Sequence, residues 1–550
     1  MLSIENSMSK VFSILGIRMV ILISSFGVVV SLFDLLSVSV LYPYIEYLTE
    51  PSKKLPQVLE FFFKELLRLE TIDVVDYSII VLGVVLLASV VKSYFTYFQV
   101  YELKKIRVDI SKRCFQKLQS LGYSGTRSLE SGRIESMFVT EIDLVVQHVL
   151  TPILSIANFV AVSLLLFIYL LFVSPALLVL SVVAFGFYYA VIGILIRKKL
   201  ATIKDKRTKS NLGRIEKTKD LINSLDVIDQ FNAWSFFERS IQDDIENFSE
   251  SSRQNQFLLK LPQILLEGLL YSMVVLVVLY FSGRGNLLDF LPEITVFAFS
   301  ALKLKPSLNS LYGLFISINF GRGGLDNISD FLRHSEGEIS NECLTRRYVK
   351  GDGVSISIED LDYSYSGTSI KVFDKLNLQF NASSITCVTG TSGRGKSTLL
   401  YLLCGLLKVS GGQIIVDSSH PVESELFKIV PQDNRLITGD IYQNVALKKN
   451  ISMNDKQRIE GILNRLGLDK FIKKGIVQGM SGGQKQRLGI ARALFTDSKC
   501  LLFDEPTSGL DLKTKKSFLE LAKVISEDRL LIIVTHDHDV MEIAEDLVTL

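Results

Sequence analysis

Residues Gly390–Thr398 read GTSGRGKST, between a β-branched run, Ser384–Thr389, and an apolar segment, Thr398–Leu407. We expect a strand, a glycine-rich loop and a helix in that order. The backbone N–H groups of such a loop point at bound phosphates, and the dipole of the following helix adds positive potential. The pattern therefore predicts an α/β domain that binds a nucleoside triphosphate at the carboxyl ends of parallel strands.

Each residue of the loop has a predicted role in holding the phosphates. Lys396 supplies a positive point charge, and the hydroxyl of Ser397 is a ligand for Mg²⁺. The predicted contacts are Gly390, Thr391, Ser392, Gly393, Gly395, Lys396, Ser397 and Thr398. ATP and Mg²⁺ are thus the expected cofactors.

Two further strings follow in a set order: MSGGQ at Met480–Gln484 and CLLFDEPTSGLD at Cys500–Asp511. The second is an apolar strand, predicted over Lys499–Phe503, that ends in two acids. All three strings together resemble the ATP-binding cassette (ABC) transporter family, and the resemblance covers the layout of the whole chain. Met480 stands where the family usually has leucine, which is a conservative change in packing.

The resemblance implies a role for several residues around the nucleotide. Tyr365, about twenty-five residues before the phosphate loop, corresponds to the aromatic residue that stacks on adenine, with Tyr363 as the alternative. Gln432, in Val430-Pro-Gln432, corresponds to the glutamine that reaches Mg²⁺ and the attacking water. Asp504 would hold Mg²⁺ through water, and Glu505 would be the general base or the group that orients the water.

Other residues correspond to positions at the seam between two copies of the domain. Ser481, Gly482, Gly483 and Gln484 would cap a helix beginning near Lys485 and face the γ-phosphate bound to the other copy. Asp511 corresponds to the loop at the dimer seam, and His536, after a strand at Leu530–Thr535, to the histidine that contacts the γ-phosphate. The composite site needs two copies, so the resemblance implies a homodimer.

The chain before residue 320 is rich in apolar stretches, in a sequence that is 48% hydrophobic with a mean hydropathy of +0.32. A bilayer core needs about 20 helical residues, and six stretches qualify. They are Val11–Ile45, Tyr77–Phe98, Leu144–Val173, Ala176–Ile196, Phe257–Phe281 and Leu287–Ile318. Since lipid cannot satisfy open strands, the domain is predicted to be all-helical.

Basic residues cluster after the second and the fourth predicted spans, which indicates that these segments and both termini are cytoplasmic. A multi-pass location in the cell inner membrane is expected. Both segments are predicted to be long helical extensions with breaks at Gly122–Ser128 and Asn223–Phe236, which resemble the coupling helices of ABC exporters; plain solvated hairpins are the alternative. The expected organisation is a transmembrane domain over 1–335, a linker over 336–352 and the ATPase domain over 353–550.

Charged residues inside spans are costly and commonly face a cavity. Asp34 is either functional or part of a structural ion pair. Lys303 either binds an anionic substrate group or pairs with an acid, and Lys305 follows two residues later. Lys92 and Glu267 are interpreted as ordinary interfacial charges.

The membrane half has a narrower resemblance to bacterial lipid-linked oligosaccharide flippases. It rests on LFDLLSVSVLYPYI in the first span, LPQILLEG at Leu261–Gly268, LKLKPS in the sixth span and the apolar face of a predicted outer helix, Pro56–Leu69. In that family the outer helix engages the polyprenyl tail and basic residues attract the pyrophosphate, a role that Lys303 and Lys305 would take here. Lys305 departs from the pattern of that family, which leaves the glycan open.

The leading hypothesis is an ATP-hydrolysing transporter that flips or exports a lipid-linked oligosaccharide or a similar amphiphile, in contact with membrane lipid. The alternative is an exporter of a peptide, a glycolipid or a small amphiphilic compound. An ATP-gated channel is disfavoured, because Glu505 and His536 are both present. Six spans exclude a soluble ATPase of the DNA-repair type, so no nucleic acid partner is expected.

Overall fold

The computed structural model describes residues 17–49, 74–127, 129, 131–283, 290–333, 346–349, 354–365, 370–418, 426–474 and 477–550. The chain divides into two compact units. The helical unit comprises Met1–Ser120 and Leu129–His334, and the α/β unit comprises Leu121–Ser128 and Ser335–Leu550. The predicted outer helix, Pro56–Leu69, lies outside the described residues.

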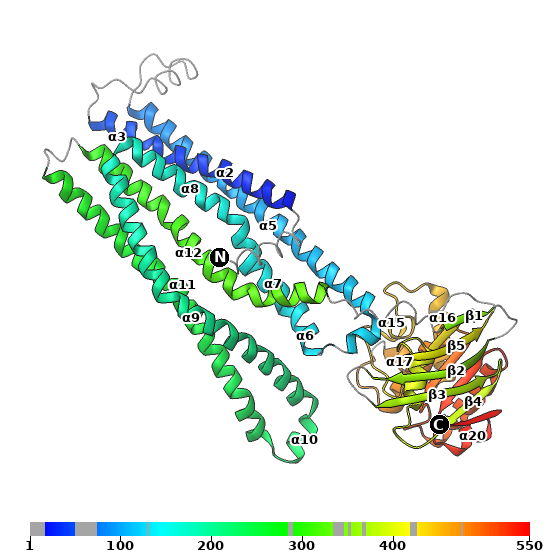
Figure 1. Cartoon of the computed structure of the whole chain (residues 1–550). Helices are drawn as coiled ribbons and strands as arrows, with labels where there is room; N and C mark the ends of the chain where they lie inside the picture. The colour runs from blue at the N-terminus through cyan, green and yellow to red at the C-terminus, as the bar shows by residue number, and fades with distance from the viewer. Residues whose placement is uncertain are drawn as a thin grey trace. The chain divides into compact units, whose positions relative to one another are not determined.

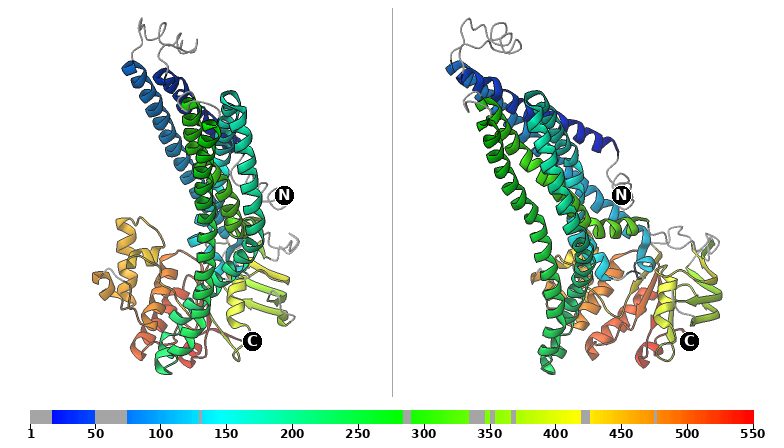
Figure 2. Two further views of the ribbon diagram at one scale, coloured as in Figure 1. Left: turned by 90° about the vertical axis from the view of Figure 1, so that its left-hand side faces the viewer. Right: turned by 60° about the vertical axis from the view of Figure 1, so that its left-hand side comes forward.

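The helical unit is built from long helices that run side by side (Figures 1 and 2). In chain order the elements are α2 (Ile17–Ser39), α3 (Leu41–Thr49), α5 (Val74–Arg127), α6 (Ser131–Ser136), the π-helix η2 (Met137–Glu141), α7 (Ile142–Val145), the π-helix η3 (Val146–Leu150), α8 (Thr151–Val173), α9 (Pro175–Asn223), α10 (Leu225–Gln230), α11 (Trp234–Ser282) and α12 (Leu291–Arg333). The two longest neighbours, α9 and α11, pack along each other.

Five of the described helices are long and apolar enough to cross a membrane: Arg18–Thr49, Val74–Thr126, Gly132–Val173, Pro175–Ile192 and Trp234–Ser282. The helix that holds the predicted sixth span, α12, is not among them, because lysines and other polar residues lower its mean hydropathy. The sixth span stays a prediction. The expected tight hairpin is present, since α8 and α9 are joined by Ser174 alone, which is extended at φ −158°.

Both predicted breaks in the helical extensions are present. Gly122 interrupts α5 with φ 62° and ψ −164°, a conformation that glycine adopts without steric cost. The residues from there to Ser128 belong to the α/β unit, where the ring of Tyr123 lies 5.7 Å from that of Tyr401. The second break is the short helix α10, between α9 and α11.

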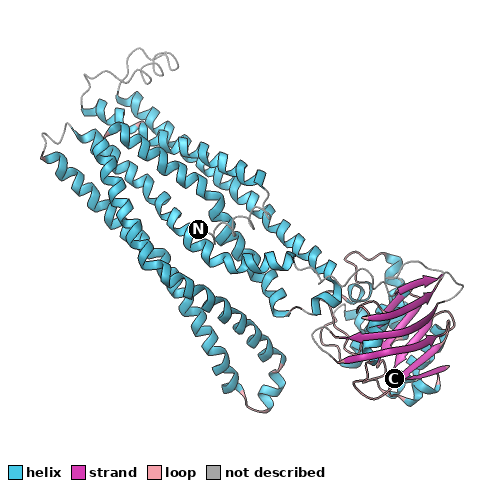
Figure 3. Cartoon of the chain, viewed as in Figure 1, coloured by secondary structure: helices cyan, strands magenta, loops and turns pink. Residues whose placement is uncertain are grey.

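Two sheets form the centre of the α/β unit, and Figure 3 draws all the described strands there. One is a parallel sheet in the order β6 (Phe427–Val430), β7 (Cys500–Asp504), β8 (Leu530–Val534), β4 (Ile385–Thr389) and β9 (Asp546–Thr549). Every residue of β7 and β8 is buried. Such continuous apolar burial is what a parallel sheet covered on both faces requires.

The second sheet has the order β1 (Arg346–Val349), β5 (Gly411–Asp417), β2 (Ser355–Ser364) and β3 (Lys371–Phe380). It is antiparallel except for the pair β1 and β5. The first of these strands lies inside the segment predicted as a linker.

Helices connect the strands of the α/β unit. They are α13 (Lys396–Leu403), α15 (Ile441–Ala446), α16 (Met453–Arg465), α17 (Asp469–Lys474), α18 (Gly482–Phe495), α19 (Leu512–Ser526) and α20 (His538–Glu542). Apolar side chains from these helices and from the buried strands form two clusters, in which Phe380 and Phe503 are completely buried.

A glycine in β5 tests how tightly the second sheet is built. Gly412 has φ +76°, and a Cβ there would lie 2.2 Å from the carbonyl oxygen of Asp360. We expect Gly412→Ala to destabilise the unit by about 1–3 kcal/mol. The matched control is Gly461→Ala in α16, where a Cβ meets nothing within 4 Å and a gain of about 0.5–1 kcal/mol is expected.

The measurement is the apparent unfolding temperature in detergent, followed as a thiol-reactive dye gains access to the buried Cys387 and Cys500. An unchanged unfolding temperature for Gly412→Ala would contradict the close approach of β5 and β2.

Candidate nucleotide-binding site

The register of the parallel sheet brings three loops to one edge. Val388 of β4 is level with Val534 of β8, which is level with Asp504 of β7. The chain that continues from each strand is tied to its neighbour, since the Glu505 N–H donates to the Val534 carbonyl at 2.9 Å and the Thr535 N–H to the Val388 carbonyl at 3.3 Å. The phosphate loop, the two acids and the histidine loop therefore meet at the carboxyl ends of the strands.

The phosphate loop is shaped by three glycines with positive φ: Gly390 at 148°, Gly393 at 84° and Gly395 at 90°. Side chains cannot easily replace the last, because a Cβ there would lie 2.6 Å from Val372. The helix α13 starts directly after Gly395, at Lys396. The loop and the helix N-terminus are thus arranged as an anion site requires.

The ammonium of Lys396 lies across the loop. It donates to the Gly390 carbonyl at 2.6 Å and to the Thr391 carbonyl at 3.3 Å, and its Nζ is 3.0 Å from Nε2 of His536. Lys396 itself is buried. This contact joins the predicted phosphate lysine to the predicted histidine, which are 140 residues apart in the chain.

The two acids after β7 differ in environment. Asp504 is hydrogen-bonded to Ser397, and burial raises the pKa of its carboxyl, with the Ser397 bond and the charge of Lys396 acting in the opposite direction. Burial also raises the pKa of Glu505, whose Oε1 lies 3.9 Å from Nε2 of His536. Glu505 has φ 51°, a conformation that is strained for a residue with a side chain.

The aromatic pair near the loop divides into one buried and one accessible residue. The Tyr365 hydroxyl is 2.7 Å from Oγ1 of Thr398, at the start of α13. The Tyr363 ring is buried and stands edge-on to that of Tyr365, with centroids 5.2 Å apart. Tyr365 is therefore the partly accessible one beside the phosphate loop.

Gln432 and the residues of the MSGGQ string lie elsewhere in the unit. Gln432 is exposed just after β6, next to the acidic strand. Ser481 and Gln484 form a reciprocal cap at the start of α18, which begins at Gly482 rather than near Lys485. Within the described residues, no hydrogen bond joins Ser481 or Gln484 to the phosphate loop.

The predicted seam residue, Asp511, caps a different helix. Its side chain accepts from the N–H of Thr514 at the start of α19, at 2.8 Å, and this hydrogen bond lowers the pKa of its carboxyl. A Cβ on Gly483 would lie 2.8 Å from the carbonyl of Gly509. The MSGGQ helix and the loop before α19 therefore adjoin within one copy.

A network beside the histidine loop was missed by sequence reasoning. Asp537 accepts from Thr507 at 2.9 Å and from Lys515 at 2.6 Å. Burial alone would raise the pKa of Asp537, but these bonds and the charge of Lys515 bring it below its ordinary value. The only sequence signal was the acid directly after His536, and its partner lies on a helix, α19, that carries no motif.

The charged residues of the helical unit form two ion-paired groups. Asp34 of α2 accepts from Lys303 of α12 at 2.7 Å and from Lys92 of α5 at 3.2 Å. Lys305 of α12 pairs with Glu267 of α11 at 3.1 Å. The interpretation of Lys92 and Glu267 as ordinary interfacial charges is therefore wrong, because both take part in ion pairs between helices.

A helical unit with several apolar spans, joined to an α/β unit with a phosphate loop, defines a membrane protein with a nucleotide-binding domain. Two family models match: ABC transporter transmembrane region over residues 20–287 and ABC transporter over residues 373–508. The chain belongs to the ABC transporter family.

Individual relatives match parts of the chain. The glutathione/L-cysteine transport system ATP-binding/permease protein CydC of Escherichia coli is 28% identical over 56% of this chain and 55% of its own length. The energy-coupling factor transporter ATP-binding protein EcfA1 of Mycoplasmopsis pulmonis is 34% identical over 34% of this chain and 74% of its own. The chain thus spans about half the length of CydC.

A solved structure resembles the whole chain. It is a bacterial Atm1-family ABC exporter with ATP bound, and it covers 97% of this chain and 94% of its own with a TM-score of 0.72 at 17% identity. At this identity the likeness establishes the fold: a helical transmembrane domain followed by an α/β nucleotide-binding domain.

The Asp537 network generates a prediction about His536. We expect Asp537→Ala to lower kcat for ATP hydrolysis by about 10- to 100-fold with little change in ATP affinity, because a displaced histidine loses its alignment. The control is Asp539→Ala, which removes a more exposed partner of the same lysine. Steady-state ATPase assays and nucleotide titrations separate the two effects, and equal losses in both variants would argue against positioning by Asp537.

Proposed function

We propose that this chain is one half of an ATP-driven exporter in the cell inner membrane, with the α/β unit on the cytoplasmic side. The observation that carries the proposal is the convergence of Lys396, Asp504, Glu505 and His536 at one edge of the parallel sheet. A five-spanned or six-spanned helical unit in the same chain supplies the path for a substrate. The breaks at Gly122 and at α10 are the coupling elements of such a machine.

The nucleotide site works by positioning and charge neutralisation. Tyr365 stacks on adenine, the loop N–H groups and Lys396 hold the phosphates, and His536 contacts the γ-phosphate. Glu505 accepts a proton from the attacking water or orients it, and Gln432 supports the same water. The strained φ of Glu505 supports this role, since such strain concentrates at functional residues.

The residues present fit a Mg²⁺ ion. Ser397 and Asp504 are oxygen donors, the ligand type that Mg²⁺ prefers, and they are already hydrogen-bonded to one another. Bound there with Gln432 nearby, the ion would neutralise charge on the phosphates. Lys396, currently bonded to loop carbonyls, would turn to the phosphate oxygens.

The protein acts as a homodimer. Ser481, Gly482, Gly483 and Gln484 cap their own helix and make no hydrogen bond to the phosphate loop of the same copy within the described residues. In the proposed dimer they close over the nucleotide of the other copy, with Asp511 at the seam. A purified protein that is monomeric and hydrolyses ATP at full rate would contradict this arrangement.

The variant Glu505→Gln tests the catalytic role. We expect ATP hydrolysis to fall by at least about 100-fold, because the amide cannot accept the proton. ATP-dependent closure of the dimer should persist, since the phosphate contacts remain. Phosphate release and ATP-dependent cross-linking of the two copies measure these outcomes, with the exposed Glu527→Gln as the control, and near-normal turnover would remove Glu505 from its role.

The substrate is an anionic amphiphile, and a lipid-linked saccharide is the leading candidate. The support comes from the ion-paired residues of α2, α5, α11 and α12, which comprise three lysines and two acids and so carry one excess positive charge. Asp34 has a side chain only 5% exposed, whereas Lys303 is 36% exposed. An incoming phosphate group would compete with Asp34 for Lys303, while the apolar tail stays in lipid. Lys305 is held by Glu267 and supports the site from the next turn.

A second candidate is a small anionic thiol compound. The relative from Escherichia coli is named for glutathione and L-cysteine transport, and glutathione carries carboxylates that Lys303 and Lys92 would attract. Reconstitution in liposomes distinguishes the candidates. Stimulation of ATPase activity and translocation by a polyprenyl-pyrophosphate saccharide, but not by glutathione, supports the first, and the reverse supports the second.

Two variants with opposite expected signs test the ion-paired site. Lys303→Gln removes a cation and should raise the concentration of anionic substrate needed for half-maximal ATPase stimulation by about 10-fold, the equivalent of one lost charged contact. Asp34→Asn frees Lys303 and Lys92 and should lower that concentration. Losses of similar size in both variants, with reduced thermal stability, would instead indicate a purely structural ion pair.

A further inference from the structure

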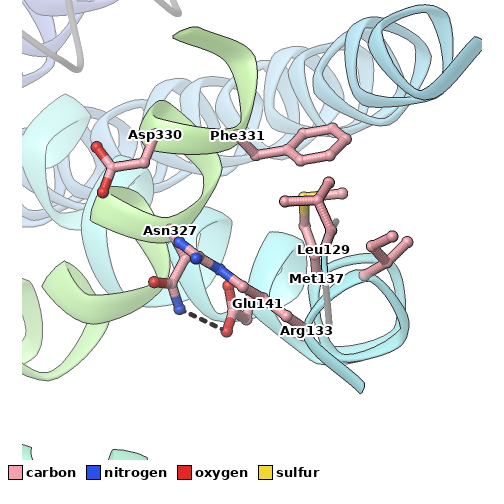
Figure 4. A pocket seen from close by; sticks show the side chains of 8 residues that line it. Leu129, Arg133, Met137, Glu141, Asn327, Asp330 and Phe331 are labelled. Carbon is pink, nitrogen blue, oxygen red and sulfur yellow. Dashed lines mark hydrogen bonds between the residues drawn. The ribbon is translucent and has the colours of Figure 1, made fainter. Parts of the chain in front are cut away.

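A pocket of about 180 Å³ lies in the helical unit where the segment after α6 meets the end of α12 (Figure 4). Its polar lining consists of Arg133, Glu141, Asn327 and Asp330, and Met137 and Phe331 contribute apolar walls. None of these residues has a role in nucleotide binding or in the ion-paired site of the membrane helices.

Glu141 is the residue that makes the pocket unusual. It is only 7% exposed, and its Oε1 accepts from Nδ2 of Asn327 at 2.8 Å. Its other oxygen, Oε2, is buried and has no hydrogen-bond partner among the described residues. Buried carboxylate oxygens without a donor are rare in folded proteins, because the lost hydration is not replaced.

The backbone holds Glu141 in this position. It is the last residue of the π-helix η2, and a second π-helix, η3, follows one turn later. Helices of this kind are uncommon and recur at functional sites. A turn to solvent is opposed by the close packing of α12, where a Cβ on Gly324 would lie 3.4 Å from the Glu141 carbonyl and one on Gly321 would lie 2.7 Å from Val149.

The charges and the size of the pocket define what would fill it. Two carboxylates and one guanidinium leave an excess of one negative charge. Among the described residues no group of three or more His, Cys, Asp or Glu side chains is arranged to hold a metal ion. The apolar walls favour an organic body, and a cavity of about 150 Å³ is known to hold benzene, so a ligand of about six heavy atoms fits.

We propose that this pocket binds a small organic ammonium ion, whose N–H donates to Oε2 of Glu141 and whose hydrocarbon part lies against Met137 and Phe331. Asp330 adds a second negative charge at the exposed side of the pocket. The bound ion bridges η2 and α12 and stabilises their packing. This site is separate from the proposed export path, and its test does not use ATP hydrolysis.

The experiment uses the full-length protein in lipid nanodiscs without nucleotide, with n-butylammonium chloride as the probe. The readout is the apparent unfolding temperature, followed through dye access to the buried Cys114 of α5. We expect a saturable rise of about 2–4 °C when the amine exceeds its dissociation constant about tenfold. Potassium chloride at equal ionic strength should give no saturable rise.

Glu141→Gln is the decisive variant. It keeps the shape and an acceptor for Asn327 but removes the charge, and the amine-dependent rise should be lost. Without amine this variant should unfold at the same temperature as the parent chain or higher, because an unpaired buried charge has been removed, which separates loss of binding from loss of folding. Asp330→Asn should weaken binding several-fold.

The matched control is Glu135→Gln, an exposed acid on α6 that lies 3.8 Å from Lys219. It should leave the rise unchanged. The proposal is overturned if n-butylammonium and potassium chloride act alike, or if Glu141→Gln retains the rise.

Discussion

The nucleotide site depends on the burial of β4, β7 and β8 as neighbouring parallel strands. Each contributes an apolar run with almost every side chain covered, so their relative register cannot slip without exposing polar backbone and mispacking both faces. That register sets Val388, Val534 and Asp504 level with one another. The residues that follow each strand then leave the sheet at the same edge, which is why Lys396, Glu505 and His536 meet.

A different constraint governs the helical unit. Apolar surroundings make an isolated charge costly, so ionisable side chains must find partners on other helices. Asp34 gathers lysines from α5 and α12, and Glu267 holds the next lysine of α12. Pairing of this kind ties α12 to two different helices just before Pro306, and any movement of α12 against either helix must exchange one of these partners.

Much of the α/β unit could be predicted because its signals are local. The glycine-rich loop demands backbone conformations that only glycine readily adopts, and the apolar strand before Asp504 could only be buried. The cap of Ser481 and Gln484 was equally legible, since both partners lie within one turn. The second sheet was less so, because β1, β2 and β5 pair across more than 60 residues of intervening chain and β1 carries no distinctive pattern.

Residues whose partners are distant in the chain could not be assigned. Asp34 and Lys303 are 269 residues apart, and Glu141 and Asn327 are 186 apart. The sequence offered the charges but not the pairs, and it offered no sign of the π-helices η2 and η3, whose extra residue per turn is imposed by packing against Gly321 and Gly324 of α12. The link of Asp537 to Lys515 is of the same kind.

By itself, the sequence determined the family, the order of an apolar helical half and a nucleotide-binding half, and the residues that surround the phosphates, because these depend on short-range backbone chemistry and on hydrophobicity. Only the tertiary structure decided which charges neutralise each other between the helices and which buried carboxylate keeps an oxygen without a donor. Those outcomes depend on distances between elements, and such distances are set by the packing of the whole unit rather than by any local stretch.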